Sequence, residues 1–365
     1  MKITVEEIID ALERVIHPAL GKNVVELGMV GDVDVDANEV SLTLTFAKSA
    51  DPMKNSMVKA CEKALQNYLH PDVVAKINVA TAHRQPLTTV ERKSLKAKNV
   101  IAVASGKGGV GKSTVAANIA VALAKLGNNV GLLDADIYGP SIPKMFGVEG
   151  VRPELTGEDG QEIIIPVERF GVRMLSIGFF TRPQDAMIWR GPMASSVIKQ
   201  LLNQSDWGAP DYLIVDLPPG TGDVHLTIVQ ELAVTGALIV STPQKVALAD
   251  VVKGINMFQT PKVNVPILGI VENMAWFTPE ELPDNRYYIF GNGGCKALAE
   301  QEGIKLLGQI PLVQGICESS DNGQPVAENE NSITGRAFIE LAKRLIDATN
   351  ERNENQPPTK RVEIG

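Results

Sequence analysis

The chain has 365 residues, 44% of them hydrophobic and 21% charged, which is enough for about two ordinary globular domains. Its 35 lysines and arginines against 43 aspartates and glutamates give a net charge of −8, which argues against general binding to nucleic acid or anionic lipid. Three cysteines are too few for a disulfide framework, and no apolar run is long enough for a membrane span. We therefore expect a cytoplasmic protein that binds neither nucleic acid nor membranes.

Residues 1–83 are expected to form a small α+β domain. Apolar residues recur at helical spacing over 5–16, and they alternate over 29–46 around a turn typical of a β-hairpin. A second helix is predicted over 51–69, beginning with an aspartate and a proline at its start, and a strand follows over 76–82.

Residues 84–98 lose apolar periodicity and contain five basic residues, so they are predicted to be an exposed linker. Over 99–350, short β-rich runs alternate with helical stretches, a pattern that predicts an α/β domain with a mainly parallel sheet flanked by helices. The predicted strands are Val100–Ser105, Val130–Asp134, Tyr212–Asp216, Ala237–Thr242 and Ile267–Val271. Residues 351–365 are polar, contain two prolines, and are predicted to be a disordered tail.

A glycine-rich motif follows the first of these strands and fits the P-loop pattern G-x-x-x-x-G-K-S. Its glycines would let successive backbone N–H groups turn inward around phosphate oxygens, where a Cβ would block the approach. Lys112 is expected to reach the β- and γ-phosphates, and the Ser113 hydroxyl to bind Mg²⁺. The alternative, a chance glycine-rich turn, is disfavoured by the strand before the motif and the helical periodicity after it. The predicted cofactors are therefore ATP and Mg²⁺, and the predicted nucleotide-binding residues are Gly106, Lys107, Gly108, Gly109, Val110, Gly111, Lys112, Ser113 and Thr114.

Carboxylates follow two other predicted strands, at the ends where open α/β sheets bind ligands. Asp134 and Asp136 end one strand, and Asp216 ends another, shortly before Gly220. Asp216 is the candidate for holding Mg²⁺, and Gly220 for contacting the γ-phosphate through its N–H group. Asp136 is the candidate for positioning the attacking water, with Asp134 supporting it. Each aspartate alone would fit a helix cap or a turn equally well.

A second lysine, Lys107, near the start of the motif resembles the deviant Walker-A family of MinD, ParA and the nitrogenase iron protein. The resemblance implies a nucleotide-sandwich homodimer in which Lys107 reaches the phosphates bound by the partner subunit. Together with the P-loop argument, it gives Lys107, Lys112, Asp136 and Asp216 as the predicted catalytic residues.

Longer strings narrow the resemblance to the Mrp/ApbC iron–sulfur cluster carriers, and residues 1–83 resemble the PaaD/SufT-like domain often fused ahead of them. The strings are residues 133–141 (LDADIYGPS), 216–223 (DLPPGTGD), 271–274 (VENM), 308–312 (GQIPL) and, in the first domain, 20–30 (LGKNVVELGMV). This resemblance implies an ATP-hydrolysing carrier that delivers clusters to apoproteins through a nucleotide-gated homodimer, alongside other iron–sulfur assembly proteins. It also implies adenine contacts at Asn273 and near Pro311.

The chain departs from that family where the cluster ligands are expected. Relatives usually carry Cys-x-x-Cys shortly after the Asn-Met pair, and two subunits then supply four thiolates to a [4Fe–4S] cluster. Here residues 276–283 read WFTPEELP, and Asp51-Pro52 stands where relatives of the first domain often have Cys-Pro. Thiolates are the usual ligands of such clusters. Because the usual cysteine motif is absent, cluster binding cannot be inferred from it.

Cys295 and Cys317 are the substitute candidates, since one of each from two subunits would give four thiolates. The alternative for both is a buried structural thiol, and Cys61 is expected to pack in a core. The four histidines lack zinc-ligand spacing, and His225 is expected on the surface at a helix start. Residues 189–192 (WRGP) are assigned a positional rather than a catalytic role.

Two other functions stay open at this point. A ParA/MinD-like positioning ATPase would call for a basic C-terminal amphipathic helix, whereas the tail has only Lys360 and Arg361 together. A cluster-free ATPase adaptor, serving another protein that carries the cysteines, would explain the missing Cys-x-x-Cys.

Overall fold

The structure is a computed structural model, and it divides into two compact units, Met1–Val90 and Glu91–Gly365, which are described separately. It describes residues 4–18, 22–27, 29–36, 39–46, 54–70, 72–81, 95–157, 162–180, 191–279, 281–282 and 284–362. Within these ranges, no helix is both long and apolar enough to cross a membrane.

The first unit is a three-stranded sheet with two helices. Its elements are α1 (Val5–Leu12), β1 (Val30–Asp36), β2 (Glu39–Phe46), α2 (Lys54–Tyr68) and β3 (Val74–Thr81). β1 and β2 pair antiparallel, which confirms the predicted hairpin, and β3 pairs parallel to β2. α1 ends at Leu12, four residues before the end of the predicted run. The hairpin turn at 37–38 and the predicted start of α2 at 51–53 lie outside the described residues.

Alternate residues of β2 build the core of this unit. Leu42, Leu44 and Phe46 are buried together with apolar residues of both helices. Cys61 on α2 is fully buried among them, and burial raises the pKa of its thiol to about 12. Cys61 is therefore a core residue, as predicted.

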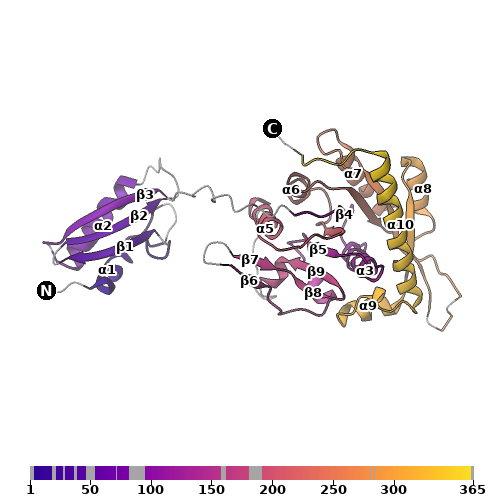
Figure 1. The fold of residues 1–365 in the computed structure, drawn as a ribbon, viewed down its shortest axis with the longest axis horizontal. Helices are drawn as coiled ribbons and strands as arrows, with labels where there is room; N and C mark the ends of the chain where they lie inside the picture. The colour runs from indigo at the N-terminus through magenta and orange to yellow at the C-terminus, as the bar shows by residue number, and fades with distance from the viewer. Residues whose placement is uncertain are drawn as a thin grey trace. The chain divides into compact units, whose positions relative to one another are not determined.

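The second unit is built on an eight-stranded sheet (Figure 1). The strand order is β13-β12-β11-β4-β10-β5-β9-β8, and every neighbouring pair is parallel except β8 with β9. The strands are β4 (Asn99–Ala104), β5 (Val130–Asp134), β8 (Val167–Arg169), β9 (Val172–Ser176), β10 (Tyr212–Asp216), β11 (Gly236–Ser241), β12 (Ile267–Phe277) and β13 (Leu306–Leu312), with β6 (Glu154–Thr156) and β7 (Ile163–Ile165) forming a separate pair. The predicted α/β fold with a mainly parallel sheet is confirmed.

Helices cover both faces of this sheet, as the continuously apolar strands require. On β4, Ile101 and Val103 face the core that includes α3 and α10, while Val100 and Ala102 face the core beneath α5 to α8. The helices are α3 (Lys112–Lys125), α4 (Ile142–Met145), α5 (Gly191–Asn203), α6 (Asp223–Glu231), α7 (Lys245–Gln259), α8 (Gly294–Glu302), α9 (Gln314–Asp321) and α10 (Ile333–Asn355), with 3₁₀ turns at Ile177–Phe179 and Val326–Glu328. Because all strands of this sheet except β8 run parallel, their carboxyl ends lie at one edge of the sheet.

The C-terminal segment differs from the predicted disordered tail. Helix α10 continues to Asn355, so it passes the predicted boundary at residue 350. Arg352 is buried and donates to the Pro357 carbonyl at 2.7 Å, and the Val362 N–H donates to the Val229 carbonyl at 2.9 Å. These contacts hold a polar segment whose composition alone indicated disorder. Residues 363–365 lie outside the described part.

The end of the predicted linker also belongs to the second unit. Leu95 and Ala97 pack partly against its core, and the Lys98 N–H donates to the Pro210 carbonyl at 3.0 Å. The predicted linker at 84–98 is therefore too long at its C-terminal end. Residues 84–94 are not among those described.

Candidate functional site

The glycine-rich loop connects β4 to α3 and turns through two left-handed glycines. Gly109 and Gly111 both have φ of +80°, a backbone conformation that a Cβ would strain. A Cβ on Gly111 would also lie 2.2 Å from Nδ2 of Asn273, and one on Gly106 would lie 2.4 Å from the Asp250 backbone. At Gly108 and Gly109, by contrast, an added Cβ would meet no atom within 4 Å. The loop is therefore packed on one side and open on the other, as a phosphate cradle requires.

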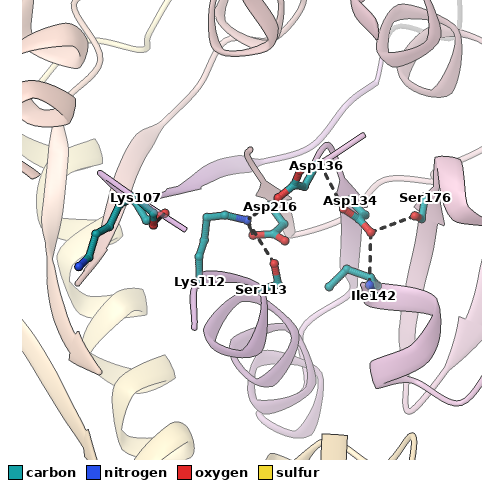
Figure 2. Close-up of polar contacts among 9 residues, drawn as sticks. Lys107, Lys112, Ser113, Asp134, Asp136, Ile142, Ser176 and Asp216 are labelled. Carbon is teal, nitrogen blue, oxygen red and sulfur yellow. Dashed lines mark hydrogen bonds and ion pairs between the residues drawn. The ribbon is translucent and has the colours of Figure 1, made fainter. Parts of the chain in front are cut away.

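Lys112 and Asp216 form a buried ion pair at the centre of the site (Figure 2). The Lys112 ammonium donates to Asp216 Oδ1 at 2.6 Å and lies 3.2 Å from the Ser113 hydroxyl. Burial raises the pKa of Asp216, and the positive charge of Lys112 opposes that rise. The second carboxylate oxygen of Asp216 is buried and finds no hydrogen-bond partner within the described ranges. This site thus brings together the three residues expected to bind phosphate and Mg²⁺.

Asp134 lies beside this pair, because β5 and β10 are parallel neighbours that place Asp134 opposite Asp216. It is fully buried, and burial together with the charge of Asp216 raises its pKa to about 7. Its oxygens accept hydrogen bonds from the Ser176 hydroxyl at 2.9 Å and from the backbone N–H groups of Asp136 and Ile142. Asp134 therefore holds the loop after β5, as Figure 2 shows.

Asp136 lies at the open side of the same cluster, with its side chain 15% exposed. Its Oδ2 is 3.9 Å from the Lys112 ammonium, and burial raises its pKa, an effect that the Lys112 charge opposes. It borders a cavity of ≈ 610 Å³ lined by Asp136, Tyr138, Gly139, Pro218, Pro219, Gly222, Asp223 and Val224. Asp136 is thus the carboxylate of the cluster that solvent can reach.

The two lysines of the loop differ in their surroundings. The Lys107 side chain is half-buried and points away from the Lys112–Asp216 pair (Figure 2). Within the part of the chain that the structure describes, its ammonium group forms no hydrogen bond or ion pair, whereas Lys112 is bound to Asp216. The two basic groups of one motif are therefore directed to different places.

The loop after β10 contacts the start of the glycine-rich loop. Gly220 has φ of +86°, and its N–H donates to the Ser105 carbonyl at 3.0 Å. Five residues on, His225 is 1% exposed. The expectation of a surface histidine is therefore wrong, since His225 is buried on a helix that packs against α5.

Asn273 ends a buried stretch of β12, behind the glycine-rich loop. Its Nδ2 donates to the Val110 carbonyl at 2.8 Å, and its side chain is buried. Pro311 is also buried, near the end of the neighbouring strand β13. The structure thus gives Asn273 a contact with the loop itself, and its predicted contact with adenine stays a prediction.

Cys295 lies at the start of α8 and is fully buried. Its N–H donates to Glu272 Oε2 at 2.8 Å, and its thiol lies 3.7 Å from the Thr242 carbonyl. Burial and the neighbouring Glu272 carboxylate raise the pKa of the thiol, which favours the protonated form over the thiolate that iron requires. This arrangement favours the alternative of a structural thiol. Cluster ligation by Cys295 stays a prediction.

Cys317 lies on α9, and its side chain is outside the described set. Among the residues that are described, no three histidines, cysteines, aspartates or glutamates gather in a way that would hold a metal ion. Residues 189–190 of the predicted WRGP segment likewise lie outside the described ranges.

Sequence reasoning missed three contributors to the site. Ser176 ends β9 and donates to Asp134, and Ser105 supplies the carbonyl that holds Gly220. Ser176 follows a short apolar run, the same signal that marked Asp134 and Asp216, but β9 was not among the predicted strands. The third is the buried His225, which was expected on the surface although Val224 and Leu226 flank it.

A parallel α/β sheet with this loop and these strand-end carboxylates defines a P-loop NTPase. The sequence model of the NUBPL iron-transfer P-loop NTPases matches residues 96–346, and that of the iron–sulfur cluster assembly proteins matches residues 5–79. The chain belongs to the NUBPL iron-transfer P-loop NTPase family, which confirms the resemblance drawn from its motifs.

Relatives along almost the whole chain support this assignment. The iron–sulfur cluster carrier protein of Synechocystis is 44% identical over 345 residues, which cover 94% of this chain and 97% of that protein. The iron–sulfur cluster transfer protein NUBPL of Dictyostelium discoideum is 43% identical, over 84% of this chain and 95% of that one. A nucleotide-binding protein from Archaeoglobus fulgidus, solved in complex with ADP, is 40% identical, with a TM-score of 0.57 over 68% of this chain and 94% of that one.

Proposed function

We propose that this protein is an iron–sulfur cluster carrier that binds and hydrolyses ATP and delivers clusters to apoproteins as a nucleotide-gated homodimer. The observation that carries the proposal is the buried Lys112–Asp216 pair on a P-loop, in a chain that aligns over 94% of its length with a protein named as such a carrier. Its expected compartment is the cytoplasm, where free thiols such as Cys61 and Cys295 stay reduced.

The residues fit a nucleotide with its magnesium ion. The open side of Gly108 and Gly109 would receive phosphate oxygens, and Lys112 would exchange Asp216 for the β- and γ-phosphates. Asp216 and Ser113 would then hold Mg²⁺, for which the unpaired Oδ2 of Asp216 is a ready acceptor. Bound Mg²⁺ would supply charge neutralisation at the phosphates.

Hydrolysis requires a water held in line with the γ-phosphate. Asp136 is the solvent-accessible carboxylate of the cluster, and Asp134 fixes its backbone through the hydrogen bond to its N–H. We therefore assign water positioning to Asp136 and loop positioning to Asp134.

Coupling to a second subunit is assigned to Lys107 and Gly220. Because the Lys107 ammonium points away from its own Lys112–Asp216 pair, it is available to the phosphates of a partner subunit. Gly220 would leave Ser105 to contact the γ-phosphate, and hydrolysis would let it return. The phosphate state would thereby set whether the dimer is closed on its cargo.

A second candidate function is a cluster-free ATPase adaptor in iron–sulfur assembly. The burial of Cys295 favours it, because this thiol cannot reach a cluster shared between subunits without moving α8. The adaptor would keep the nucleotide cycle and leave the thiolate ligands to its partner protein.

Anaerobic reconstitution distinguishes the two functions. Iron and sulfide are counted per dimer in the wild type and in the Cys295→Ser and Cys317→Ser variants, and the wild type is then mixed with an apoprotein acceptor. The carrier should bind iron, lose it only in Cys317→Ser, and activate the acceptor. No iron in the wild type sinks the direct carrier and leaves the adaptor. Loss in Cys295→Ser would restore that residue as a ligand.

A further inference from the structure

His225 occupies an unusual position for an uncharged imidazole, at the first turn of α6 directly after the loop that follows β10. The ring nitrogen Nδ1 accepts a hydrogen bond from the Gly222 N–H at 3.2 Å. The backbone N–H of His225 donates to the Gly222 carbonyl at 3.0 Å. Gly222 is the N-cap of α6. The histidine thus takes the place that Glu or Gln has in a capping box, and it ties the loop to the helix.

The proton of this imidazole follows from the same contact. Because Nδ1 accepts, the neutral ring carries its hydrogen on Nε2. Burial, with a smaller contribution from the positive charge of Lys112, lowers the pKa of His225 to about 4, so the ring is neutral at physiological pH.

The Nε2–H group is buried, and it has no hydrogen-bond partner among the residues that the structure describes. Buried donors are almost always paired, so an unpaired one marks a group that is used in another arrangement or by a ligand. The short loop before His225 starts from Asp216 at the end of β10, and among the described residues Asp216 also has an unpaired buried oxygen. The two unpaired groups are of opposite kind, a donor and an acceptor.

We propose that His225 is the positioning residue of the loop at residues 218–222, with its two nitrogens serving the two positions of that loop. Nδ1 holds the Gly222 N–H while Gly220 is bound to Ser105. Nε2–H is the donor that becomes paired when Gly220 leaves Ser105 for the nucleotide. The inference rests on the proposed nucleotide cycle and adds to it the residue that steadies the moving loop.

Two substitutions separate the nitrogens in the full-length chain. His225→Ala removes both, whereas His225→Asn places an amide oxygen where Nδ1 lies and has nothing at Nε2. Thr227→Val is the matched control on the same helix, since it removes hydrogen bonds to Ser195 and to the Asp223 carbonyl without touching the loop.

The first measurement is amide hydrogen exchange in peptides covering 217–226, without nucleotide. His225→Ala should speed exchange of the Gly222 amide about tenfold, whereas His225→Asn and Thr227→Val should stay near the wild type. The role of Nδ1 is overturned if His225→Ala exchanges as slowly as the wild type. It is also overturned if His225→Ala and His225→Asn speed exchange equally.

The second measurement is steady-state ATP hydrolysis. His225→Asn should lower kcat about tenfold with KM unchanged within a factor of about three, because Nε2–H acts only after binding. A wild-type kcat in that variant overturns the role of Nε2. A wild type that hydrolyses no ATP refutes the proposed function instead, and the exchange comparison without nucleotide still decides the anchoring of Gly222.

Discussion

Two buried carboxylates lie at the same edge of the large sheet, and their hydrogen bonding differs. Asp216, on β10, binds Lys112 through one oxygen, and its other oxygen has no partner in the described part of the chain. Glu272, on β12, has both oxygens paired, one with the Cys295 N–H at 2.8 Å and one with the Gln309 amide at 2.7 Å. The edge around β10 therefore has groups that can change partners. Around β12, Glu272 has no free oxygen, because its hydrogen bonds link β12 to β13 and to α8.

This difference separates the binding of nucleotide from the binding of cargo. A site that must accept phosphate needs donors whose present partners are replaceable, and the Lys112–Asp216 pair provides them. A thiol that must bind iron needs exposure and a lowered pKa, and Cys295 has neither. The residues that fit a nucleotide thus gather in unit 2 around β4, β5 and β10, whereas the buried Cys295 thiol is not in the form that binds iron.

Lys112→Ala gives the largest expected effect. The affinity for ATP should fall about 10³-fold, because the variant loses the cation that neutralises the phosphates inside a buried site. The dissociation constant of a fluorescent ATP analogue, measured by titration, checks this expectation. Lys125→Ala is the matched control, since Lys125 lies on the same helix and pairs with Glu328 and Glu330. Unchanged binding in Lys112→Ala would remove the distinction between the two halves of the edge.

Lys107→Ala should separate binding from hydrolysis. Because its ammonium has no partner within its own described surroundings and points away from Asp216, ATP affinity should stay within about threefold. Hydrolysis should fall about 100-fold if the group serves the partner subunit, as an arginine finger does in trans. Phosphate release at saturating ATP measures this. Equal rates in variant and wild type would refute the role in trans.

The raised pKa of Asp134 predicts how stability depends on pH. Its folded pKa of about 7 lies above the ordinary 3.8, so between those values the folded state holds a proton that the unfolded state has lost. Its contribution to the free energy of unfolding is thus greatest below pH 4 and is lost as the pH rises through 7.

Asp134→Asn should remove this pH dependence, since an amide does not titrate. All three tryptophans lie in unit 2, so their fluorescence during denaturant unfolding at pH 5 to 8 reports on that unit. Asp211→Asn is the control. The hydrogen bond from Lys98 lowers the pKa of Asp211, so this carboxyl group does not titrate in that range. A variant whose stability falls with pH as steeply as the wild type would contradict the assignment.

Local patterns were sufficient to predict the position of the site, because an apolar run followed by Asp134 or Asp216 marks a strand end wherever the strand lies in the sheet. They could not predict the Lys112–Asp216 pair, whose members are 104 residues apart. Nor could they predict the burial of His225 or the order of the tail beyond residue 350. Those features depend on tertiary contacts, such as the packing of α6 against α5 and the hydrogen bond from Arg352 to Pro357. The P-loop prediction succeeded since its chemistry is contained in nine consecutive residues.

Asn273→Ala gives the smallest expected effect and tests where the two halves of the edge meet. Asn273 follows Glu272 on β12, yet its amide binds the Val110 carbonyl of the glycine-rich loop. If it acts by holding that loop, the variant should lose about fivefold in affinity for ATP and for GTP alike, the value of one buried hydrogen bond. If it reads the adenine base, only ATP should weaken. Titrating both nucleotides separates these outcomes, and an equal loss would show that β12 supports nucleotide binding from behind the loop.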